Sequence, residues 1–86
     1  MNLQQSNSFV YNRQLAATLL IQQTGMSIQA ALQLRREDVR ELGNKKTVGG
    51  FSLWPIPYEL FAYLEIRDSL LPESLYLFPS ITGEAL

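Results

Sequence analysis

The stretch Thr-Gly-Met-Ser-Ile-Gln-Ala-Ala-Leu-Gln-Leu-Arg-Arg-Glu-Asp-Val, residues 24–39, decides the fold, because it reads as a helix end, a short helix and a strand entry. Gly25 tolerates the left-handed conformation found just past a helix. Ser27 is a preferred helix cap and predicts a second helix to about Leu34. The segment therefore predicts two neighbouring helices that lead into a strand.

A longer helix is expected before this break. Asn12 is a suitable N-cap, and leucines recur at helical spacing through residues 13–24. Residues 1–8 are polar, and little in them offsets the entropy lost on ordering, so we expect a flexible N-terminus. Residues 9–86 are enough for a single small domain and for no second one.

Beyond residue 38 the pattern changes to short extended runs. Residues 39–42, 45–48 and 51–54 are separated by Gly-Asn and Gly-Gly turns, which predicts a three-stranded antiparallel meander. Prolines at 55 and 57 stop further pairing, and a third helix is expected over about residues 58–70. Residues 74–80 read as a short extended run. The predicted fold class is α+β, with helices around a small three-stranded antiparallel sheet.

Composition excludes several kinds of site. The chain has no cysteine and no histidine, which argues against disulfides, metal centres and triad chemistry, and we expect no cofactor. No apolar run reaches the ~18 residues of a membrane helix, so we expect a cytoplasmic protein without membrane contact. The net charge of -1 gives no overall attraction to DNA, and any nucleic-acid binding needs a local patch.

Several motifs, in order, resemble the tyrosine recombinases of the phage integrase family. In that family a segment like residues 24–39 runs Thr-Gly-Leu/Met-Arg-Ile-x-Glu and ends in Asp-Ile/Val. Lys46-Thr47 resembles the family's Lys-Thr, Trp-Pro-Ile-Pro at 54–57 resembles its helix entry, and Tyr-Leu-Phe-Pro-Ser at 76–80 resembles the stretch after that helix. The resemblance implies the first half of a recombinase catalytic domain, and with it an ancestry in DNA recombination and integration by mobile elements.

The resemblance also implies lost catalysis. Ser27 stands where the family has the arginine that clamps the scissile phosphate, and Ala30 stands where it has glutamate. Lys46 matches the family lysine that serves as general acid. The family's second arginine, its histidines and its nucleophilic tyrosine would follow Leu86. We therefore expect no catalytic residue and no enzyme, but a partial, integrase-like protein with at most weak binding to double-stranded DNA.

Two interpretations stay open for the polar candidates. Ser27 either contacts a phosphate or simply caps its helix, and Asp38 is expected to anchor a turn. Four cations near the predicted sheet either face DNA or belong to a solvated surface of mixed charge: Arg35, Arg36, Lys45 and Lys46.

A second functional hypothesis is a self-associating interaction module with no role on DNA. Half of a catalytic domain would leave apolar faces uncovered, and such faces typically associate with a partner protein or with a second copy in a homodimer. The leucines and the phenylalanine expected to divide between core and interface are Leu15, Leu19, Leu60, Phe61, Leu64, Leu70 and Leu71. The other aromatic side chains expected to pack in or around the core are Phe51, Trp54, Tyr63 and Tyr76.

Overall fold

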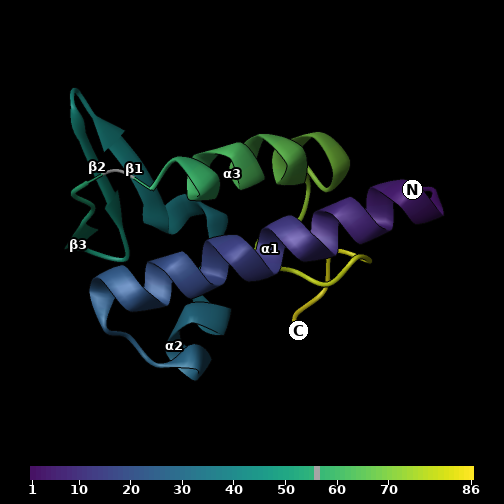
Figure 1. The fold of residues 1–86 in the computed structure, drawn as a ribbon, viewed down its shortest axis with the longest axis horizontal. Coiled ribbons are helices and arrows are strands. Elements are labelled where there is room, and N and C mark those ends of the chain that lie inside the picture. Colours follow the sequence, from purple (N-terminus) through teal and green to yellow (C-terminus); the bar gives the residue numbers. More distant parts are fainter. Residues whose placement is uncertain (56) are drawn as a thin grey trace.

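The computed structural model describes residues 1–55 and 57–86 and has the predicted α+β class. Two helices, a three-stranded sheet and a third helix follow one another along the chain. The sheet lies at one end of the two longer helices, the first and the third (Figure 1). The elements are α1 (Leu3–Thr24), α2 (Ile28–Gln33), a 3-10 turn η1 (Arg36–Asp38), β1 (Val39–Leu42), β2 (Lys45–Val48), β3 (Phe51–Ser52) and α3 (Tyr58–Leu70).

Helix α1 begins earlier than predicted. Its N-cap is Asn2, which forms a capping box with Gln5, and the expected start at Asn12 is wrong. Asn12 instead donates from its side chain to the carbonyl of Ser8, one turn earlier in the same helix. The reason for the longer helix is Phe9, which is fully buried with its ring centroid 5.8 Å from that of Tyr63. Burial of this ring anchors the first turns, so the segment expected to be flexible is helical.

The break after α1 matches the sequence pattern. Gly25 has a φ of 75° and donates its N–H to the carbonyl of Ile21, which satisfies a helix-terminal acceptor. Ser27 then caps α2, which packs against α1 and whose residue Ala31 is buried. The prediction of a short second helix is confirmed.

The sheet has the order β1-β2-β3 and is antiparallel throughout. Val39 pairs with Val48 and Leu42 with Lys45, while Val48 also faces Phe51 across the second pair of strands.

Strand β3 is shorter than predicted. The expected core positions of Trp54 and Phe51 are wrong, since Trp54 is 82% exposed and Phe51 is 44% exposed.

The exposure of the two aromatics follows from where β3 ends. Leu53 is buried directly after the strand, so the next side chain, Trp54, points away from the core. Phe51 belongs to β3, an edge strand of two residues that pairs with β2 on one side. The predicted Trp-Pro-Ile-Pro entry to α3 includes Ile56, which lies outside the described residues.

The core lies between α1 and α3 and extends under the sheet. Tyr63 is at its centre, tilted against Phe9 and stacked on Phe78 at 5.6 Å. Its hydroxyl donates to the carbonyl of Leu77 at 2.7 Å, and burial raises the pKa of this phenol. The other large core side chains come from all parts of the chain: Leu20, Val48, Leu53, Leu60 and Leu64.

The C-terminal run does not join the sheet. Only an isolated antiparallel bridge links Tyr76 to Arg35 in this region. The N–H of Leu77 donates to the carbonyl of Leu34 at 3.0 Å, and the N–H of Arg36 donates to the carbonyl of Leu75 at 2.9 Å. The run therefore lies against the residues that lead into β1, with Leu77 buried in the core.

Arg67 is the buried cation of this fold, and the sequence pattern gave no sign of it. Its side chain is 1% exposed and lies under the C-terminal run. Nε and Nη2 donate to the carbonyl of Tyr76 at 3.0 and 2.7 Å, Nη2 also donates to the carbonyl of Ser74, and Nη1 pairs with Asp68 at 2.8 Å. A planar guanidinium suits this fixed, divided arrangement of acceptors.

We predict that Arg67→Ala lowers the free energy of unfolding by about 3 kcal/mol, because it leaves two carbonyls unpaired and opens a cavity. Urea denaturation followed by circular dichroism measures this loss. Arg40→Ala, at an exposed strand position, serves as control and should change the value by no more than about 0.5 kcal/mol. A loss below about 1 kcal/mol for Arg67→Ala would contradict the anchoring role.

Candidate nucleic-acid interface

Ser27 has a structural role as the N-cap of α2. It lies at the start of α2, and its hydroxyl oxygen accepts a hydrogen bond from the N–H of Ala30 at 3.0 Å. That N–H is one of the free donors at a helix start, which a serine side chain satisfies. The capping interpretation of Ser27 is confirmed.

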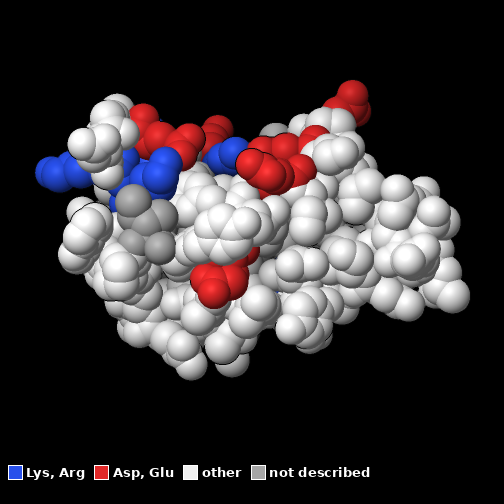
Figure 2. Space-filling model, turned by 45° about the horizontal axis from the view of Figure 1, so that its top comes forward, with Lys and Arg blue, Asp and Glu red and all other residues white. Residues whose placement is uncertain are grey.

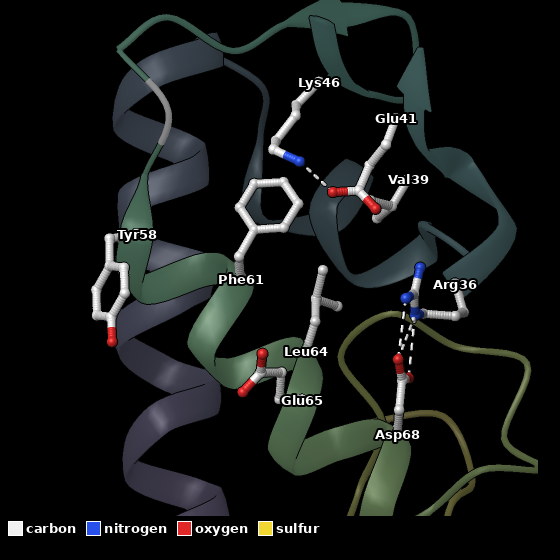
Figure 3. Close-up of a pocket in the computed structure, with 9 residues that line it drawn as sticks. All are labelled: Arg36, Val39, Glu41, Lys46, Tyr58, Phe61, Leu64, Glu65 and Asp68. Carbon is white, nitrogen blue, oxygen red and sulfur yellow. Dashed lines mark hydrogen bonds and ion pairs between the residues drawn. The ribbon is translucent and has the colours of Figure 1, made fainter. Parts of the chain in front are cut away.

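Arg36 is held by an acidic residue of α3. Its Nε donates to Oδ1 of Asp68 at 3.0 Å and its Nη2 to Oδ2 at 2.9 Å, a two-point pair (Figure 3). The hydrogen bond from Arg36 holds the pKa of the Asp68 carboxyl below its usual range, and the same bond raises the pKa of Arg36. The charge of this predicted DNA contact is thus compensated inside the fold.

Lys46 is also compensated. It faces Glu41 directly across β1 and β2, and the two side chains form an ion pair. The hydrogen bond from Lys46 lowers the pKa of Glu41. The ammonium also lies 4.8 Å from the centre of the Phe61 ring, a cation–π arrangement that holds it over α3.

Arg35 and Lys45, the other two predicted contacts, have exposed side chains in different places. Arg35 lines a groove with α2 and the C-terminal residues, and its backbone N–H donates to Asp38 at 2.7 Å, as expected of a turn anchor. Lys45 begins β2 beside the Gly43 turn. Neither takes part in the ion pairs recorded for residues 1–55 and 57–86.

The two paired cations meet in one cleft between the sheet and α3, which we call the sheet–α3 cleft (Figure 3). It has a volume of about 680 Å³. Phe61 and Leu64 form its apolar floor, while Glu65 adds a third carboxylate to those of Glu41 and Asp68. The residues that line it are Arg36, Val39, Glu41, Lys46, Tyr58, Phe61, Leu64, Glu65 and Asp68. Three carboxylates against two cations make this cleft unfavourable for phosphate.

The charges of the molecule are unevenly spread. Lys and Arg gather at the end that carries the sheet, and Asp and Glu lie beside them along α3 (Figure 2). Helix α1, with 22 residues, has Arg13 as its one charged side chain, and Arg13 donates to the carbonyl of Pro79.

Arg40 of β1 is a further exposed cation at the sheet end, which sequence reasoning did not select. The signal that could have found it is strand alternation, because Arg40 and Glu41 must point to opposite faces.

The residues proposed for self-association offer little exposed area. Leu60 and Leu64 are buried in the core, and Phe61, Leu70 and Leu71 pack half-buried against it. Leu15 and Leu19 are half-buried on α1. The large exposed aromatics lie elsewhere. Trp54, 82% exposed, follows β3, and Tyr58, 78% exposed, is the first residue of α3.

Over residues 1–55 and 57–86, no group of three or more acidic side chains is placed to hold a metal ion. In the same part of the chain, none of the helices has the length and apolar character to cross a membrane.

We predict that Ser27→Ala lowers the free energy of unfolding by about 1 kcal/mol, because it leaves the N–H of Ala30 without its cap. Ser27→Asp, which keeps a capping oxygen, should restore most of the stability. Thermal unfolding of the three proteins tests the order. Equal stability of Ser27→Ala and the parent would show that the cap contributes nothing.

Comparison with known proteins gives no relative for this chain. It matches no protein-family model, no curated protein and no solved structure. The resemblance to tyrosine recombinases therefore stays a prediction that rests on the motifs and their order.

Proposed function

We propose that this chain is a catalytically incomplete, integrase-like relative of the tyrosine recombinases that retains weak binding to double-stranded DNA. Support comes from the motifs of the sequence, together with an order of helix, helix, three strands and helix that agrees with the expected first half of the catalytic domain. In this proposal the protein acts in the cytoplasm, without metal or cofactor, in the recombination or integration of a mobile element.

The single observation that carries DNA binding is the concentration of cations at the sheet. Five of the seven Lys and Arg residues fall within residues 35–46: Arg35, Arg36, Arg40, Lys45 and Lys46. Two of these five, Arg36 and Lys46, are neutralised by carboxylates, which leaves three exposed cations for a polyanion. Sequence-independent DNA affinity arises from such contacts, and few contacts give weak binding.

The absence of catalysis is part of the same proposal. Phosphoryl transfer needs a cation fixed on the phosphate oxygens where charge develops in the transition state. The resemblance places Ser27 at that position, where a short neutral side chain is occupied as a helix cap. Lys46 is likewise held by Glu41 and Phe61 rather than free to serve a leaving hydroxyl.

The test is fluorescence anisotropy of a labelled duplex across a salt series. We expect binding at low salt, with a plot of log affinity against log salt concentration whose slope is roughly -2 to -3, since about 0.9 is expected for each cation on phosphate. No anisotropy change at the lowest salt concentration would refute DNA binding. Binding that ignores salt would refute its electrostatic basis.

A second candidate function, self-association without DNA, is favoured by one observation. Phe51, Trp54 and Tyr58 are all exposed within one short stretch around β3 and the start of α3. Exposed aromatic residues are typical of the central contacts of protein interfaces. In this alternative the aromatic stretch meets the same stretch of a second copy.

For this alternative, we expect a dimer by sedimentation of the parent protein and a monomer for Trp54→Glu, because a carboxylate would be buried in the interface. Tyr11→Glu, at an exposed position of α1, is the matched control and should stay dimeric. A parent protein that sediments as a monomer at high concentration rules out the candidate.

A further inference from the structure

The two faces of the sheet differ in their neighbours. Val39, Glu41 and Lys46 point toward α3 and line the sheet–α3 cleft, as Figure 3 shows. Because successive residues of a strand point to opposite faces, Arg40 and Lys45 lie on the other face. We call this the outer face of the sheet, and its members are Arg40, Leu42, Lys45, Thr47 and Ser52.

The outer face carries positive charge without a carboxylate. The acidic residue of β1 and β2 is Glu41. It lies on the opposite, inner face of the sheet, which lines the sheet–α3 cleft, and there it pairs with Lys46. Arg40 and Lys45 are exposed, and neither occurs in the ion pairs found among residues 1–55 and 57–86. The ion pairing inside the fold thus removes the charge of Lys46 from the inner face and leaves two uncompensated cations on the outer one.

The strand register places the two cations close together. Arg40 faces Thr47 directly, and Lys45 is two residues from Thr47 along β2, so Arg40 and Lys45 are diagonal neighbours. Such pairs have Cα atoms about 7–8 Å apart, within reach of long side chains. Thr47 and Ser52 face each other beside them and add two hydroxyl groups, which are common donors to phosphate oxygens.

We propose that the outer face of the sheet is the surface that contacts the phosphate backbone of duplex DNA, with Arg40 and Lys45 on phosphates and Thr47 and Ser52 beside them. This inference rests on the proposed DNA binding and assigns it to one face. The argument is charge complementarity: a polyanion is attracted to the face with two free cations and repelled by the cleft with three carboxylates.

The experiment compares the parent protein with Arg40→Gln, Lys45→Gln and the double variant by duplex anisotropy across salt. Each single variant should reduce the magnitude of the salt slope by about 1. The double variant should lose at least about tenfold in affinity at low salt. Arg13→Gln, which removes the same charge from α1, outside the sheet and outside the cations proposed for DNA binding, is the matched control and should change the slope far less.

The outcomes separate this inference from the function on which it rests. If the parent binds and the double variant binds equally well, or Arg13→Gln weakens binding as much as Arg40→Gln does, the assignment to the outer face is refuted while DNA binding stands. If the parent does not bind, the proposed function itself fails. Circular dichroism verifies folding of each variant, and Lys45→Gln alone, beside the exposed turn, carries the test if Arg40→Gln does not fold.

Discussion

The buried guanidinium of Arg67 is the contact on which the placement of the sheet depends. It joins α3 to the carbonyls of Ser74 and Tyr76, and so fixes the C-terminal run on the core. That run in turn binds the backbone of Leu34 and Arg36, immediately before β1. A buried charge without such partners would be costly, so the cation enforces one path for the chain. The sheet is held at its place relative to α3 through this chain of contacts.

The same packing divides the cations of the sheet end into two groups. By setting β1 and β2 against α3, it brings Arg36 to Asp68 and Lys46 to Glu41 and Phe61. Charges so paired add little attraction for an external anion, and the third carboxylate of the cleft, Glu65, shifts the balance further toward negative. The overall charge of the chain therefore says little about its DNA affinity, which depends on the cations that the fold leaves unpaired.

Local signals made much of the fold predictable. Gly25 and Ser27 act within one turn of the chain, and the glycine turns of the meander are equally local, so the bounds of α2, β1, β2 and α3 follow from the sequence. The start of α1 also has a local signal, the capping box of Asn2 and Gln5, but the burial of Phe9 against Tyr63, far along the chain, cannot be read from that segment. Trp54 was wrongly expected in the core for a related reason. Strand β3 ends at Ser52, and Leu53, not Trp54, is the buried residue that follows it.

The candidate site was less predictable than the fold, because pairing across elements decides which charges are free. The sequence showed Arg36 and Lys46 as cations near a turn, but not that Asp68 of α3 and Glu41 would neutralise them. Arg67 looked like any charged residue of a helix, although it is buried. Arg40 was overlooked beside Glu41, yet strand alternation separates the two onto opposite faces.

The most direct test of this division of charges is a titration of isotope-labelled protein with a short duplex, followed by amide NMR shifts. The account predicts that the largest shifts fall on β1–β3, at Arg40, Lys45, Thr47 and Ser52, and fade as salt is added. Shifts centred on the cleft residues of α3, such as Phe61 and Glu65, would contradict it. So would a spectrum that the duplex leaves unchanged.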